Sequence, residues 1–136
     1  MKDVASPTDT KTDPAGEAQL AADVFARGCA SRPVLQDVTG RWGTLALAAL
    51  HAGPSRFNAL RRRVDGVSEK MLSQTLQALE RDGLVLRDVQ GTIPPRVEYR
   101  LTDLGAQVAE RLVGLIELLE GSIETVVAAQ QAYDER

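Results

Sequence analysis

The stretch from Gly53 to Leu101 constrains the fold more than any other part of the chain, because its periodicity changes from helical to alternating. Two short segments first carry apolar residues at helical spacing. These residues are Phe57, Leu60 and Val64 in the first segment and Leu72, Leu76 and Leu79 in the second. The runs "LVLRDV" (84–89) and "RVEYRL" (96–101) then alternate between apolar and polar residues, as strands with one buried face do. The stretch therefore predicts two helices followed by two strands.

Caps and turns separate these segments. We expect Ser55 to cap the first helix and Ser68 the second, because a serine hydroxyl at an N-cap accepts a backbone N–H of the first turn. "VDGV" (64–67) is predicted to be the turn between the helices, and Gly83 to close the second helix. "QGTIPP" (90–95) joins the strands with turn-forming residues. The arrangement predicts a winged helix-turn-helix, a fold that is mainly α with a small β-hairpin wing.

Helical patterns precede this stretch. Residues 17–27 and 33–39 are predicted to form two short helices, with Pro33 in the first turn of the second. Residues 41–52 are predicted to form a core helix that stops before Gly53. Its buried stripe is expected to contain Trp42, Leu45, Ala49 and Leu50.

A long apolar-periodic segment of some thirty residues follows Thr102. One of its two apolar series is Val108, Leu112, Leu115, Leu119 and Val126, and the other lies one residue along. A domain of this size leaves so wide a stripe uncovered, so the segment is expected to dimerise, with close helix crossing or a break near Gly121. For the last twelve residues, folding back onto the same chain is an equally strong alternative.

The remaining organisation follows from length and composition. Residues 1–16 are predicted to be a disordered tail, because they offer almost nothing to bury. Residues 17–136 are predicted to form a single winged-helix domain with additional N- and C-terminal dimerisation helices. The sequence contains no apolar run typical of a membrane span or a signal peptide, so we expect a cytoplasmic protein without a membrane partner.

The charges are unevenly distributed along the chain. The net charge is −3, but residues 28–103 hold eleven basic and eight acidic residues, whereas the segments on either side are acidic. A basic centre can present a local positive surface on an acidic protein, and local potential steers a polyanion. The distribution therefore permits double-stranded DNA as a partner, although solvated lysines and arginines are the simpler explanation.

Several side chains around the helix-turn-helix suit contact with DNA. With Leu72, Leu76 and Leu79 turned inward, the second helix presents Glu69 and a set of candidate DNA-contacting residues. This set is Ser68, Lys70, Ser73, Gln74 and Gln77. The candidate phosphate-contacting residues are Arg56, Arg61, Arg62 and Arg63, of which at least one could instead pair with Glu69 or Asp65.

The wing carries candidate contacts of its own. Arg96 and Arg100 bracket the returning strand, and prolines stiffen the loop before it. Such a loop suits a DNA backbone or minor groove, with Arg96 as the candidate contact. The alternative is a sheet edge that proline and charge protect from pairing.

The only cysteine, Cys29, has two interpretations. It lies two residues from Arg27 and three from Arg32, just before a predicted helix, and both cations and helix N-termini lower the pKa of a thiol. A reactive, redox-sensing thiolate is one interpretation. A small buried hydrophobic residue is the other.

Catalysis is not expected. One histidine and one cysteine do not make a zinc site, and the sequence contains neither a glycine-rich phosphate loop nor a nucleophile motif. No metal and no cofactor is predicted.

The sequence resembles the HxlR-type regulators, a branch of the MarR-like winged-helix transcription factors, over residues 29 to about 120. The resemblance is carried by Cys29, by "GRW" at 40–42, by "GPSRFNALRRRVDGVSEKMLSQTLQALERDGLV" at 53–85 and by "PPRVEYRLTDLG" at 94–105. It implies a homodimer on a palindromic operator, with Ser68–Asp82 as the recognition helix and residues 89–96 as the wing loop. Members of the family often sense oxidants or electrophiles with such a cysteine.

Two positions depart from the family pattern. Ala30 follows the cysteine where proline is common, which affects the expected geometry of the cysteine loop. Gln77 stands where a basic residue is frequent, which affects the expected operator sequence.

Three hypotheses follow for function. The first is a dimeric, sequence-specific transcriptional regulator gated by oxidation or electrophile modification of Cys29. The second is a winged-helix module that binds another protein. The third is a regulator switched by a non-covalent small-molecule ligand at the dimer interface, which is compatible with the first.

Overall fold

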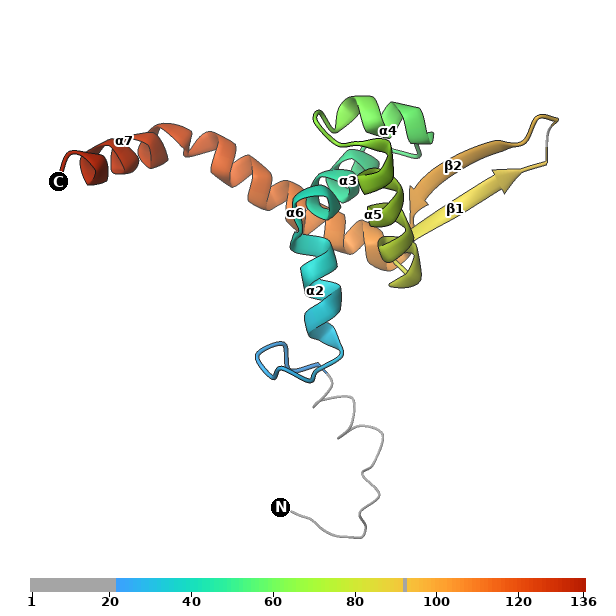
Figure 1. Cartoon of the computed structure of the whole chain (residues 1–136), viewed down its shortest axis with the longest axis horizontal. Coiled ribbons are helices and arrows are strands. Elements are labelled where there is room, and N and C mark those ends of the chain that lie inside the picture. The colour runs from blue at the N-terminus through green and yellow to red at the C-terminus, as the bar shows by residue number, and fades with distance from the viewer. Residues whose placement is uncertain (1–21, 92) are drawn as a thin grey trace, which may run out of the picture. The chain divides into compact units, whose positions relative to one another are not determined.

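The computed structural model describes residues 22–91 and 93–136, and the chain divides into two units, Met1–Thr39 and Gly40–Arg136 (Figure 1). The tail predicted over residues 1–16 lies outside the described residues, as does the beginning of the helix predicted over 17–27.

The described part of the first unit consists of turns followed by α2 (Ser31–Thr39). The helix predicted over 17–27 is wrong for residues 22–27, which form turns. The Asp23 carboxylate accepts the N–H of Phe25 at 3.2 Å. The Arg32 guanidinium donates to the carbonyls of Val24 and Phe25 at 3.0 and 2.8 Å. These side chains occupy backbone groups that a helix would pair internally, and so they favour turns.

The second unit begins with α3 (Arg41–His51), which packs against α5 (Glu69–Arg81) and α6 (Asp103–Gly121). The stripe predicted for this helix is only partly right. Leu50 is buried, but Ala46 and Leu47 are the other core residues, whereas Leu45 is 40% exposed and Trp42 only half-buried. Because α3 is apolar on almost every side, periodicity alone could not decide which face its neighbours cover.

The helix-turn-helix consists of α4 (Phe57–Arg63) and α5, joined by a turn in which Gly66 has a φ of +91°. Ser68 caps α5 as predicted, since its hydroxyl accepts the N–H of Met71 at 3.1 Å. The predicted apolar side of α5 is confirmed, because its three leucines are at most 1% exposed. Gly83 follows the helix with a φ of +78°, which favours glycine.

Ser55 does not cap α4, contrary to the prediction. Arg56 is the N-cap residue, and its side chain makes no capping hydrogen bond. Ser55 instead forms an antiparallel bridge with Tyr99, in which each backbone N–H donates to the other residue's carbonyl, at 2.9 and 2.8 Å. The partner lies far along the chain, so no local pattern could reveal this pairing.

The wing is an antiparallel hairpin of β1 (Val85–Gln90) and β2 (Arg96–Leu101), as predicted. Its register runs from Val85 opposite Leu101 to Gln90 opposite Arg96. The Arg100 guanidinium lies 3.6 Å from the Asp88 carboxylate on the neighbouring strand. Val85 is buried at the base of the hairpin, while Ile93 near the tip is fully exposed.

The junction between the wing and α6 is tight. Thr102 caps α6 by accepting the Gly105 N–H at 2.9 Å, and its hydroxyl donates to the Gly83 carbonyl at 2.7 Å. A Cβ atom added at Gly105 would collide with the backbone carbonyl of Leu84. The start of α6 is therefore fixed to the segment that leaves α5.

Beyond α6, Ser122 separates it from α7 (Ile123–Asp134), so of the two alternatives expected for this segment the structure shows the break near Gly121. The structure buries no residue of α7. Within the described residues, no helix is both long and apolar enough to cross a membrane.

Candidate nucleic-acid interface

The exposed side of α5 carries most of the predicted base-contacting residues. Lys70, Gln74 and Gln77 are exposed and Ser73 is half-buried. Positions 70, 73, 74 and 77 share one face of a helix, because residues three and four apart are neighbours there. Glutamine can bind adenine through two hydrogen bonds, and lysine suits guanine or phosphate. The structure thus brings these four residues together on a single polar surface.

Ser68 serves two purposes at the start of this surface. Its oxygen accepts the Met71 N–H, so it is occupied as the cap of α5. The hydroxyl hydrogen remains available as a donor, and the residue is exposed. A phosphate is the natural acceptor for such a donor at a helix N-terminus.

The predicted phosphate-contacting arginines do not form one set. Arg56, Arg61 and Arg62 are all exposed. The Arg61 guanidinium lies 3.6 Å from the Glu69 carboxylate, which confirms that one arginine pairs with Glu69. Both partners are largely solvated, so the pair contributes only about 0–1 kcal/mol and is readily exchanged for a phosphate.

Arg63 differs from its neighbours, because it lines a cavity beside α3 and α6. The surface beside Arg61 and Arg62 is instead a shallow depression of about 540 Å³, and Asn58 also lines it. Asn58 was not predicted from the sequence, because a single exposed asparagine carries no periodic signal.

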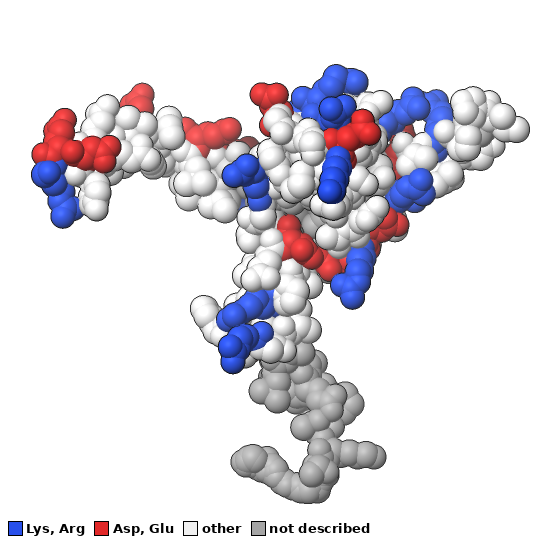
Figure 2. Space-filling model, viewed as in Figure 1, with Lys and Arg blue, Asp and Glu red and all other residues white. Residues whose placement is uncertain are grey.

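Basic residues also follow the wing. Figure 2 shows Lys and Arg gathered over α4 and along the hairpin, whereas Asp and Glu predominate along α7. Arg96 is exposed opposite Gln90, near the tip, while Arg100 is held by Asp88. Arg87, exposed on β1, is a further candidate phosphate contact that sequence reasoning did not single out.

Cys29 belongs to the first unit and is 6% exposed. Its Sγ lies 3.4 Å from the Ser31 hydroxyl. Burial raises the pKa of the Cys29 thiol, but three other influences together lower it below its ordinary value. They are the hydrogen bond with Ser31, the backbone N–H groups of Arg32 and Ser31, and the positive charge of Arg32. Arg27, which the sequence suggested as a second cation, is not among these causes.

The described residues hold no group of three or more His, Cys, Asp or Glu side chains that could bind a metal ion. The polar groups that converge here are donors suited to DNA bases and phosphates rather than ligands of a cation.

Comparisons with known proteins agree on one family. Residues 37–126 match the family model described as HxlR-like helix-turn-helix. The chain is 50% identical over 114 residues to the HTH-type transcriptional regulator YtfH of Escherichia coli strain K12, a match that covers 84% of this chain and 88% of that protein.

Two solved structures show the same fold. One is ytfH from Salmonella typhimurium, described as a transcriptional regulator, with 50% identity and a TM-score of 0.73 over 79% of this chain and 96% of that chain. The other is the redox regulator HypR in its oxidised form, with 32% identity and a TM-score of 0.63 over 68% of this chain and 96% of that chain. All three relatives are described as regulators. The winged helix-turn-helix predicted from the sequence is confirmed. The chain therefore belongs to the HxlR-like helix-turn-helix family of transcriptional regulators.

Proposed function

We propose that the protein is a homodimeric regulator that binds a palindromic DNA operator with sequence specificity. The observation that carries this proposal is the two-sided nature of α5. Its leucine side is fully buried, while Lys70, Gln74 and Gln77 form an exposed polar stripe on the other side. A recognition helix needs such a division, because one side must be held rigidly while the other reads base edges. The proposal implies a cytoplasmic location, where the DNA lies.

Apolar residues on α6 and α7 support the dimer. Leu115, Leu118 and Leu119 are between 50% and 65% exposed, and Ile123 is 55% exposed. Burying one such side chain completely stabilises a protein by about 1.5–3 kcal/mol. On a palindromic operator, the two recognition helices of such a dimer are expected to lie roughly 34–36 Å apart, which is one turn of the duplex.

Fluorescence anisotropy with selected operator DNA and with random DNA tests this function. Specific binding should exceed random binding, and both should weaken steeply as salt rises, because bound cations release counterions from DNA. A winged-helix module that binds another protein would show no such salt-dependent affinity for DNA. That outcome would replace the proposed function with the alternative.

We further propose that Cys29 gates DNA binding. The lowered pKa of its thiol and the likeness to a redox regulator support this role. In a peroxide reaction, the thiolate attacks an oxygen, the O–O bond breaks, and a sulfenic acid and an alkoxide or hydroxide form. A second thiol then displaces water and leaves a disulfide. The chain has only one cysteine, so the second thiol is the partner protomer's Cys29 or a small thiol.

The burial of Cys29 sets a condition for this switch, since the oxidant must reach a side chain that is 6% exposed. Diamide or peroxide is expected to weaken operator binding by the wild type and to leave the Cys29→Ser variant unaffected. If the serine variant loses DNA under oxidant to the same extent, the thiol does not gate binding.

A further inference from the structure

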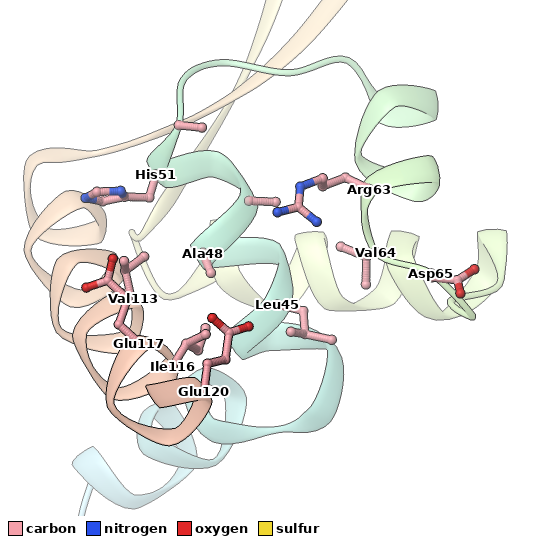
Figure 3. Close-up of a pocket in the computed structure, with 12 residues that line it drawn as sticks. Leu45, Ala48, His51, Arg63, Val64, Asp65, Val113, Ile116, Glu117 and Glu120 are labelled. Carbon is pink, nitrogen blue, oxygen red and sulfur yellow. The ribbon is translucent and has the colours of Figure 1, made fainter. Parts of the chain in front are cut away.

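A cavity of about 510 Å³ opens between α3, the turn after α4 and α6 (Figure 3). Sites for small molecules usually occupy about 300–1,000 Å³, so this volume suits a ligand rather than a single water or ion. All of its lining residues belong to the second unit. The apolar part of the wall includes three alanines of α3 together with Leu45, Val64, Val113 and Ile116.

The cavity exists because α3 presents small side chains to α6. Ala48, Ala49 and Ala52 line one wall, and larger residues at these positions would fill the space against Val113 and Ile116. Protein interiors are otherwise packed as densely as organic crystals. The alanine wall is therefore apolar, and its small side chains leave room for an apolar group of a ligand.

The rim of the cavity is charged, and the charges are separated. Glu117 and Glu120 project from α6 and lie on one side of that helix, because they are three residues apart. Asp65 lies in the turn after α4, and Arg63 reaches into the space from the α4 side (Figure 3). Among the described residues, no ion pair engages Glu117 or Glu120. His51 also lines the cavity. The three carboxylates outnumber Arg63 and His51 together, so the rim favours a cation.

A second copy of the chain is a poorer occupant. Its α7 offers apolar residues, but the charged residues of that helix are Glu124 and Asp134, and it contains no lysine or arginine. Placing acidic residues beside Glu117 and Glu120 would add repulsion between like charges. A small cationic ligand avoids this conflict.

We propose that this cavity binds a small organic cation with an aromatic body. The ammonium group lies against Glu117 and Glu120, and the aromatic ring lies on the alanine wall. The Arg63 guanidinium stacks on the opposite face of the ring, as arginine does on aromatic systems. The wall thus selects the ring, and the rim selects the sign of the charge.

The position of the cavity connects ligand binding with DNA binding. Its walls come from α6, from the helix at the centre of the core, and from Val64 and Asp65, which open the turn that leads to α5. This regulatory part rests on the proposed function. A ligand between these walls favours a different placement of α5 relative to α6, and operator affinity is expected to fall about 5- to 150-fold, as two coupled sites commonly allow.

Isothermal titration calorimetry of the full chain without DNA tests the site directly. The probe is 4-phenylbutylamine, and 4-phenylbutyrate is its control because it has the same ring and linker with the opposite charge. The amine is expected to bind and the carboxylate to bind at least tenfold more weakly. Equal binding of the two, or tighter binding of the carboxylate, would overturn the proposal.

A pair of variants locates the binding. Glu117→Gln with Glu120→Gln is expected to weaken amine binding at least tenfold, and both positions are exposed, so folding is not at stake. Glu110→Gln with Glu124→Gln removes the same charge from exposed positions outside the cavity and should leave binding unchanged. If both double variants weaken binding equally, the effect is only net charge, and the site is refuted.

A final measurement separates the site from its regulatory role. Operator affinity is measured by anisotropy with and without saturating amine. A lower affinity supports the coupling, whereas unchanged affinity with bound amine overturns the coupling and leaves the site. A chain that binds amine but never binds DNA refutes the proposed function, not the cavity.

Discussion

Base recognition depends on single residues of α5. Gln74→Ala is expected to change operator preference and to cost about 1–3 kcal/mol of binding free energy on the preferred site, if its amide bonds one base through two hydrogen bonds. Gln74 is exposed, so the loss should not come from unfolding. Anisotropy on a panel of operator variants measures the change.

Arg62→Ala is the matched control for a phosphate contact. It should weaken specific and random DNA alike and should reduce the salt slope by about one unit, because one counterion fewer is released. Equal losses on specific and random DNA for both variants would reject the division between base-reading and phosphate-binding residues.

The Cys29 thiol provides a pH prediction. Because its pKa is lowered, the thiolate fraction near neutral pH exceeds that of the same thiol in the unfolded chain. The rate of iodoacetamide alkylation should therefore reach its half-maximum at a lower pH in the folded protein than in the urea-unfolded protein. Ser31→Ala removes a hydrogen bond to the sulfur and should move the midpoint upward.

Arg32→Lys keeps the positive charge but removes the guanidinium hydrogen bonds to the Val24 and Phe25 carbonyls. The variant therefore separates the effect of the charge on the thiol pKa from the effect of these hydrogen bonds on the turns. Burial slows alkylation at every pH, whereas the midpoint reports the pKa alone. A wild-type midpoint at or above that of the unfolded protein would contradict the prediction.

At the scale of elements, the start of α6 is the most constrained joint. Gly105→Ala is expected to lower the free energy of unfolding by about 1–3 kcal/mol, because the new methyl group would overlap the Leu84 carbonyl. Urea unfolding measures the loss.

Gly114→Ala is the control within the same helix. No atom lies within 4 Å of a Cβ at that position, and alanine should stabilise a helix interior by up to about 1 kcal/mol. Gly114 is exposed, as are its helical neighbours Glu110, Arg111 and Glu117, so the added methyl group needs no repacking within the protomer. If both substitutions raise the free energy of unfolding, α6 does not pack tightly against Leu84 at Gly105, and the prediction is wrong.

The elements differ in how far the sequence predicts them. The helix-turn-helix and the hairpin were predictable because each has a clear period and a local cap or turn, such as Ser68 and Gly83. The turns at 22–27 and the buried face of α3 were not, since the first depends on Arg32 from α2 and the second on which neighbours cover an almost wholly apolar helix.

The candidate interface shows the same limit. The exposed residues of α5 could be predicted from the spacing of its leucines, because the side of a helix opposite a buried apolar side faces solvent. The difference between Arg62 and Arg63 did not follow, because adjacent arginines look alike in sequence and only the packing of α3 and α6 directs Arg63 into a cavity.

At the scale of the whole molecule, dimerisation should depend on the apolar stripe of α6. Leu115→Glu with Leu119→Glu is expected to weaken self-association at least about 100-fold, because two carboxylates would be buried without partners. Sedimentation equilibrium at micromolar concentration measures this. Gln107→Glu adds one negative charge at an exposed position off the stripe and should leave the dimer intact. A wild type that is monomeric under these conditions would refute the proposed homodimer.

The backbone bridge between Ser55 and Tyr99 has a mechanical consequence. The bridge joins β2 to the segment just before α4. The wing is therefore expected to move together with the helix-turn-helix. Each protomer then moves its wing and its helix-turn-helix as one unit. In the proposed dimer, α6 and α7 connect the two units, so an effector that shifts either helix changes the distance between the two DNA-contacting surfaces.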